Sequence, residues 1–223
     1  MIITIDGPAA SGKSAVAQRL AGRLGFWFLN TGAMYRAIGL EAVRQKLSLT
    51  DGSTVIAMAR ELVIDFDWID TPPEVLISGW RPGGLLNLEE IAAAASAVAR
   101  FPEIRDIMVA QQRRFGVERD NLVTEGRDQG SIVFPNAQLK FYLTADVKVR
   151  ATRRHKQLVS REIPADFDEV LLELTRRDAN DTSRPVGRLV KPVEAHVIDS
   201  SETHDIDRVV DQFEQITKTI RAT

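Results

Sequence analysis

The segment GPAASGKS, which runs from Gly7 to Ser14, has the residue types and the spacing of a phosphate-binding loop. Its glycines allow the backbone to turn sharply, so that several N–H groups can point at one phosphate. Lys13 has the charge and the length to reach the β- and γ-phosphates of a nucleotide, and the hydroxyl of Ser14 suits a Mg²⁺ ligand. The segment therefore predicts a site for ATP and Mg²⁺. The residues expected to hold the nucleotide are Gly7, Pro8, Ala9, Ala10, Ser11, Gly12, Lys13, Ser14 and Ala15.

The flanking sequence supports this interpretation, because such a loop should follow a strand and open a helix. The apolar run at 1–6 (MIITID) predicts a strand. Residues 15–24 place Val16, Leu20 and Leu24 at helical spacing. The N-terminal end of that helix would add a positive dipole beside the phosphates. A plain turn between strand and helix would not explain Lys13 and Ser14 directly after Gly12.

Arginines gather in the last third of the chain, and phosphoryl transfer needs positive charge around the transferring oxygens. Arginines that close over ATP would supply that charge and exclude water. The alternative, kept open for Arg150 and Arg161, is a solvated helix face. No NKxD motif of GTPases and no LSGGQ motif of transporters is present. The arginines concerned are Arg150, Arg153, Arg154, Arg161, Arg176, Arg177, Arg184 and Arg188.

Strands alternate with helices along most of the chain, which predicts an α/β fold with a parallel sheet covered by helices on both faces. Five strands are expected, at 1–6, 26–29, 121–124, 139–143 and 195–198. Short strands at 63–66 and 75–78 and a loop at 80–87 break the alternation, which indicates an insertion at about 63–100. We expect a single P-loop kinase domain over 1–223, with this insertion beside its core.

Composition excludes several other classes of protein. The net charge of −2 gives no global polycation for nucleic acid. No apolar run reaches the roughly 18–20 residues of a membrane span. Cysteine is absent, which excludes disulfides and thiolate metal sites. His155, His196 and His204 share no metal-ligand spacing. A cytoplasmic location is expected.

The sequence resembles the bacterial cytidylate kinases, a family of nucleoside monophosphate kinases, along essentially its whole length. The resemblance implies transfer of the γ-phosphoryl group of ATP to CMP and dCMP, with Mg²⁺, in a monomer. It also implies a helical lid at about 150–168. The segments that carry it are IDGPAASGKS, NTGAMYR at 30–36, ASAVARFPEIR at 95–105, EGRDQGSIVFP at 125–135, RRDANDTSRP at 176–185 and AHVIDSS at 195–201.

The same resemblance implies that Ser96, Arg105 and Asp128 read the cytosine base. A carboxylate such as Asp128 can accept from the N4 amine of cytosine, whereas uracil presents an oxygen there. Arg105 would donate to the acceptor edge of the base. Two alternatives stay open: Asp128 as a structural partner of Arg127, and Ser96 as an ordinary helix residue.

For the acceptor phosphate, the resemblance implies Arg36, Arg127 and Arg184, with the hydroxyl of Thr31 beside them. Arg177 and Asp181 match the positions that hold the ribose hydroxyls, although they could instead be an i,i+4 helix pair. Arg153 and Arg154 match the start of the lid helix, where one would stack on adenine and one would reach the phosphates. The residues expected to carry the transfer are Lys13, Arg127, Arg153, Arg154 and Arg184.

The sequence departs from the family pattern at several positions, among them Ser131 in place of the usual Thr, and two alternative functions remain. The segment WRPGGLLN at 80–87 lacks the charged pattern of the family's insertion, and Asn30 stands where Asp is common. One alternative is a kinase of another small acceptor, such as shikimate or dephospho-CoA. The other is a nucleotide-binding regulator without turnover, which would be expected to lack some of the cations named above.

Overall fold

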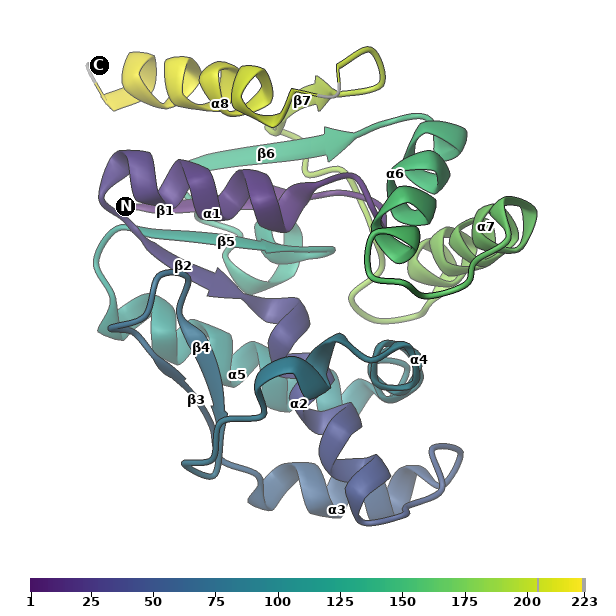
Figure 1. Ribbon diagram of the computed structural model, residues 1–223. Coiled ribbons are helices and arrows are strands. Elements are labelled where there is room, and N and C mark those ends of the chain that lie inside the picture. Colours follow the sequence, from purple (N-terminus) through teal and green to yellow (C-terminus); the bar gives the residue numbers. More distant parts are fainter. Residues whose placement is uncertain (204, 222–223) are drawn as a thin grey trace. The chain divides into compact units, whose positions relative to one another are not determined.

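The computed structural model describes residues 1–203 and 205–221, which form two compact units (Figure 1). The first unit consists of Met1–Phe26 with Asn121–Thr223, and the second of Trp27–Asp120. The five-stranded parallel sheet has the order β2-β5-β1-β6-β7 and is surrounded by helices, which confirms the expected fold class. The insertion at about 63–100 and the lid at about 150–168 stay predictions.

In the first unit, three parallel strands end at the same edge of the sheet. Asp6, the last residue of β1, pairs in register with Gly126 of β5 and with Tyr142 of β6. Every residue of β5 is buried, and so are the last four of β1. Burial on both faces explains the largely apolar sequence of β1, whereas β5 (LVTEG) also buries Thr124 and Glu125. The segments that follow β1 and β5 therefore begin close together. The strands of this unit are β1 (Ile2–Asp6), β5 (Leu122–Gly126), β6 (Leu139–Thr144) and β7 (His196–Asp199).

Two pairs of helices belong to this unit. Helix α1 packs against β5 and α8, and it buries Val16 and Leu20 as the spacing predicted. Arg23 of α1 donates to Asp211 of α8 at 2.5 Å. Helices α6 and α7 pack against each other (Figure 1). The helices are α1 (Lys13–Leu24), α6 (Val147–Val159), α7 (Phe167–Ser183) and α8 (Ile206–Arg221). His204 lies outside the described residues.

The second unit combines four α-helices with short strands. The two short strands expected in the segment that breaks the alternation are present as β3 and β4, and they pair in antiparallel direction. The segment at 80–87, expected as a loop, contains a 3-10 helix at Gly83–Asn87. Helix α2 lies so close to α4 at Gly39 that a Cβ added there would be only 2.8 Å from the backbone nitrogen of Ala95. The elements are β2 (Trp27–Asn30), α2 (Thr31–Arg44), α3 (Gly52–Glu61), β3 (Ile64–Asp67), β4 (Glu74–Ile77), α4 (Glu89–Val98) and α5 (Pro102–Glu118).

None of the described helices combines the length and the apolar character that crossing a bilayer requires.

Candidate active site

The P-loop follows β1 and opens α1, and its backbone requires glycine at two positions. Gly7 has φ +154°, and a Cβ there would lie 2.0 Å from the carbonyl oxygen of Leu143. Gly12 has φ +92° and is the N-cap of α1. The loop folds around the Lys13 side chain, whose Nζ donates to the carbonyl oxygen of Pro8 at 2.6 Å. The expected strand, glycine loop and helix are therefore all present.

Several charged side chains converge on Lys13, which is only 5% exposed. Burial lowers the pKa of Lys13 to about 7, and the charges of Arg127 and Arg177 act in the same direction. The carboxylates of Glu125 and Asp181 oppose this shift. Burial and neighbouring cations both disfavour a further positive charge, so an anion such as a phosphate would relieve the cost of keeping Lys13 protonated.

Ser14 and Glu125 form a pair of oxygen ligands beside the loop. The Ser14 hydroxyl donates to Oε1 of Glu125 at 2.9 Å. A hydroxyl and a carboxylate are oxygen donors of the kind that Mg²⁺ prefers, and this ion usually keeps several waters beside few protein ligands. The pair therefore fits Mg²⁺. Among the described residues, no cluster of three or more His, Cys, Asp or Glu side chains could hold a metal ion by itself.

Arg127, Asp181 and Arg184 form an ion-pair cluster. Nε of Arg127 donates to one carboxylate oxygen of Asp181 at 2.6 Å, and Arg184 donates to the other oxygen. Burial alone would raise the pKa of Asp181, but the charges of Arg127 and Arg184 hold it below its usual value. The carboxylate thus fixes two guanidinium groups beside the P-loop. Arg177, which lies on α7 together with Asp181, also helps to lower the pKa of Asp181.

Asp128 lies in a turn that is anchored from β1. The turn Gln129–Val133 is π-helical, and Asp128 is 5% exposed at its start. The two carboxylate oxygens of Asp6 accept from the backbone N–H groups of Gln129 and Gly130, each at 2.8 Å. Asp6 therefore joins the strand that leads into the P-loop to the turn that carries the expected base-reading carboxylate.

The arginines of α6 differ in their surroundings. Arg153 donates to the carbonyl oxygens of Ser200 and Thr203, at 2.5 and 2.9 Å. Arg154 donates to the side chain of Gln157 at 2.7 Å. Arg150 is only 5% exposed, so the solvated-face alternative is wrong for this residue.

Four expected acceptor residues belong to the second unit. Thr31 is buried at the first position of α2, and a Cβ added at Gly32 would lie 3.4 Å from Nη1 of Arg36, so that guanidinium lies beside the start of the helix. The guanidinium of Arg105, on α5, lies 5.5 Å from the ring centre of Tyr35. Ser96 is half-buried on α4.

Comparisons with known proteins agree with the resemblance in the sequence. The family model for cytidylate kinase matches residues 3–220. The chain belongs to the cytidylate kinase family. The cytidylate kinase of Bordetella pertussis is 44% identical over 200 residues, covering 90% of this chain and 87% of that protein. The cytidylate kinase of Pasteurella multocida is 39% identical over 212 residues, covering 95% and 92%.

Solved structures with a similar fold are more distant in sequence than these cytidylate kinases. A shikimate kinase from Bacteroides thetaiotaomicron has a TM-score of 0.51 and 9% identity, covering 98% of each chain. An uncharacterised protein from Eubacterium ventriosum has a TM-score of 0.52 and 12% identity, covering 100% of this chain and 99% of that one. At these identities the likeness concerns the fold alone.

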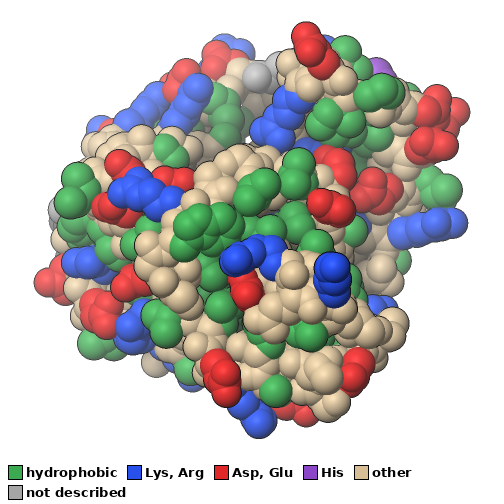
Figure 2. Space-filling model, turned by 60° about the horizontal axis from the view of Figure 1, so that its bottom comes forward, with side chains coloured by type: hydrophobic (Ala, Val, Ile, Leu, Met, Phe, Trp, Pro, Cys, Tyr) green, Lys and Arg blue, Asp and Glu red, His purple; other side chains and the backbone are tan. Residues whose placement is uncertain are grey.

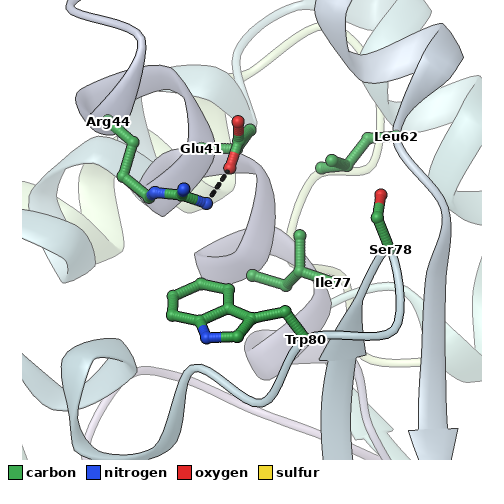
Figure 3. Close-up of a pocket in the computed structure, with 6 residues that line it drawn as sticks. All are labelled: Glu41, Arg44, Leu62, Ile77, Ser78 and Trp80. Carbon is green, nitrogen blue, oxygen red and sulfur yellow. Dashed lines mark hydrogen bonds and ion pairs between the residues drawn. The ribbon is translucent and has the colours of Figure 1, made fainter.

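The second unit of this cytidylate kinase family member also contains a small pocket of about 260 Å³ (Figure 3). Arg44 lies over the indole ring of Trp80, 4.8 Å from its centre, and forms an ion pair with Glu41 at 2.9 Å. Arg44 follows Arg36 by eight residues on α2, about 12 Å along the helix axis. The pocket is therefore distinct from the expected phosphate site at the start of α2. Its lining residues are Glu41, Arg44, Leu62, Ile77, Ser78 and Trp80.

Sequence reasoning missed Asp6 and Asp178 as parts of the site of this cytidylate kinase family member. A signal for Asp6 was present, because an aspartate at the end of an otherwise apolar strand needs a partner. Asp178 pairs with Arg150 at 2.7 Å, but the two are 28 positions apart on different helices. No local spacing relates them, so only the fold brings them together.

Proposed function

We propose that this chain transfers the γ-phosphoryl group of ATP to CMP and dCMP, producing CDP and dCDP with release of ADP. The observation that carries the proposal is the charge cluster around Lys13, in which Arg127 and Asp181 act on the lysine and Arg184 binds the same Asp181 carboxylate, in a member of the cytidylate kinase family. The proposed functional residues are those that the resemblance implies, together with Glu125.

The cations would supply most of the catalysis. An in-line phosphoryl transfer spreads charge over the transferring oxygens, and fixed positive groups stabilise that charge. Lys13 would contact the β- and γ-phosphates, while Arg127 and Arg184 would contact the phosphate of the acceptor. Arg153 and Arg154 would approach from α6. The acceptor monophosphate is already largely a dianion near pH 7, so no general base is required.

Ser14 and Glu125 would hold Mg²⁺. When bound, the ion would neutralise part of the phosphate charge. The role of the two side chains is to present a hydroxyl and a carboxylate oxygen beside the P-loop, at the 2.9 Å separation described above.

Acceptor recognition would rest on the residues that the resemblance implies. Asp128 would accept from N4 of cytosine, with Arg105 and Ser96 on the remaining base edge. Arg36 and Thr31 would bind the monophosphate. The Asp128 carboxylate is buried, and a buried carboxylate facing the uracil oxygen would oppose UMP.

Arg177 and Asp181 would hold the ribose hydroxyls. Both oxygens of Asp181 already accept from arginines. An ionised carboxylate has about four lone-pair sites, so Asp181 can also accept from a ribose hydroxyl.

Substitution of Lys13 and Asp128 tests the proposal. Lys13→Ala should lower kcat with CMP by at least about 100-fold, because a phosphate-contacting cation is lost. The matched control is Lys148→Ala, an exposed lysine of α6, and it should stay within twofold of the wild type. Retention of full turnover by folded Lys13→Ala protein would refute the P-loop mechanism.

Asp128→Ala should reduce the ratio of kcat/KM for CMP to that for UMP by roughly tenfold or more. Asp120→Ala, which removes an exposed carboxylate, should leave this ratio unchanged. An unchanged ratio in the Asp128 variant would return Asp128 to a structural role.

Partners and location are also proposals. We expect a monomer, a cytoplasmic location and no nucleic-acid partner. The net charge of −2 supports the last point, and Figure 2 shows acidic side chains interspersed with basic ones on the face drawn there. Light scattering would measure the oligomeric state.

A further inference from the structure

Ala9, the third residue of the P-loop, is hydrogen-bonded by two side chains from helices that are far from it in the sequence. Nη1 of Arg150, on α6, donates to the carbonyl oxygen of Ala9 at 3.0 Å. The N–H of Ala9 donates to Oδ1 of Asp178, on α7, at 3.3 Å. Both backbone polar groups of one loop residue are therefore engaged by side chains rather than by secondary structure.

Arg150 and Asp178 also bind each other. Nη1 of Arg150 lies 2.7 Å from Oδ2 of Asp178, and Nε of Arg150 donates to the carbonyl oxygen of Ala145 at 2.9 Å. The Arg150 side chain is 7% exposed and that of Asp178 is 21% exposed. The guanidinium thus has three oxygen partners from three segments, all within the first unit.

Apolar contacts reinforce this arrangement. Ala9 is 3% exposed and belongs to the same buried cluster as Ala151 and Leu158 of α6 and Val170 and Leu174 of α7. Ala10, the next loop residue, packs against that cluster and has φ +57°. The P-loop is therefore joined to α6 and α7 by both polar and apolar contacts at one point.

Arg150 and Asp178, which together anchor Ala9, lie on their helices beside side chains expected to bind the nucleotides. Arg150 lies three residues before Arg153 on α6, and Asp178 lies between Arg177 and Asp181 on α7. A shift of α6 or α7 relative to Ala9 would move the P-loop relative to these side chains. Displacements near 1 Å in such a site can cost large factors in binding or rate.

We propose that Arg150 and Asp178 are positioning residues that fix the P-loop at Ala9 relative to α6 and α7 and thereby set the affinity for ATP. The inference rests on the proposed function only in taking ATP as the nucleotide. The competing interpretation is a buried ion pair that contributes to stability alone. Such pairs can often be replaced by apolar residues at little cost, so the two interpretations predict different outcomes.

The test measures Mg–ATP binding and CMP binding separately by titration calorimetry, without turnover. Arg150→Met should weaken ATP binding roughly tenfold, whereas CMP binding should stay within twofold. Arg150→Lys keeps the charge but not the forked donors, so it should restore part of the ATP affinity. Lys148→Met removes an exposed cation two residues away and should leave both affinities unchanged.

Asp178→Asn provides an independent test in case the Arg150→Met protein does not fold. The amide keeps an oxygen for the N–H of Ala9 but removes the charge pair, so ATP binding should weaken by a smaller factor. The loss of ATP affinity in the double variant Arg150→Met/Asp178→Asn should be no larger than the product of the two single losses, because both substitutions disrupt the same ion pair.

ATP affinity within twofold of the wild type in folded Arg150→Met and Asp178→Asn proteins, whatever their melting temperatures, would overturn the proposal. This outcome is separable from failure of the proposed function. A wild-type protein that binds ATP but does not bind or phosphorylate CMP would refute the acceptor assignment, and the ATP arm would still test the anchor.

Discussion

The carboxyl group of Asp6 should make the stability of this protein depend on pH near neutrality. Asp6 is fully buried at the end of β1. Burial raises its pKa from 3.8 to about 7, while hydrogen bonds from the N–H groups of Gly130 and Gln129 act in the opposite direction. A proton on Asp6 would have an acceptor nearby: Thr4 Oγ1 is buried without a hydrogen-bond partner among the residues that the structure describes, and it lies with Asp6 Oδ2 beside Gly130.

The sign of the effect follows from which state binds the proton. Between pH 3.8 and about 7 the folded chain keeps a proton on Asp6 that the unfolded chain has lost. The stability that this group contributes is therefore fully present below pH 3.8 and is lost as the pH rises towards 7. A shift of about three pKa units corresponds to roughly 4 kcal/mol in total. Above the folded pKa the contribution no longer changes.

Urea denaturation of the wild type and of Asp6→Asn, at half-unit steps from pH 5 to 9, isolates this contribution. Asparagine does not titrate, so the difference in unfolding free energy between the two proteins cancels the titrating groups that do not interact with Asp6, that is, all but its neighbours Lys13 and Asp128. That difference should move against the wild type by roughly 1.4 kcal/mol per pH unit from pH 5 to about 7 and then level off. A difference that stays flat between pH 5 and 7 would refute the reasoning and would mean that the two N–H donors keep Asp6 ionised throughout.

Gly7→Ala should destabilise the fold by about 2 kcal/mol or more, because the new Cβ would lie 2.0 Å from a carbonyl oxygen at φ +154°. Urea denaturation measures this, and a loss below about 0.5 kcal/mol would contradict the loop geometry. Gly39→Ala should cost about 1–3 kcal/mol, because its Cβ would lie 2.8 Å from a backbone nitrogen of α4. Gly84→Ala is the matched control, because no described residue has an atom within 4 Å of the added Cβ, and it should stay within about 0.5 kcal/mol of the wild type.

The elements of the sheet and the P-loop could be predicted because their signals are local. β1 is buried and its sequence is a largely apolar run, and β5 begins with the buried apolar pair Leu122 and Val123. The P-loop signal lies within eight consecutive residues, between a strand and a helix. The two short strands of the second unit were also predicted, but their antiparallel pairing is seen only in the structure.

The contacts that shape the candidate site could not be predicted in the same way, because they join residues far apart in the chain. The bond from Gln129 to Asp6 spans 123 positions, and that from Arg150 to Ala9 spans 141. An Arg-rich helix is typical of a solvent-exposed face, so nothing in the local sequence indicated that Arg150 is buried. At 80–87 a local signal was present but misleading. Its glycines indicate a loop, yet part of the segment forms a 3-10 helix.

The most direct test of the central claim is an ADP-release assay with ATP and Mg²⁺, in which CMP, dCMP, UMP, AMP, GMP and shikimate are offered in parallel. We predict fast turnover with CMP and dCMP and much slower turnover with the other acceptors. Preferred turnover of another acceptor would retain the P-loop chemistry and contradict the base recognition assigned to Asp128. Absence of turnover with every acceptor, in protein that binds ATP, would contradict the assignment as a kinase of CMP.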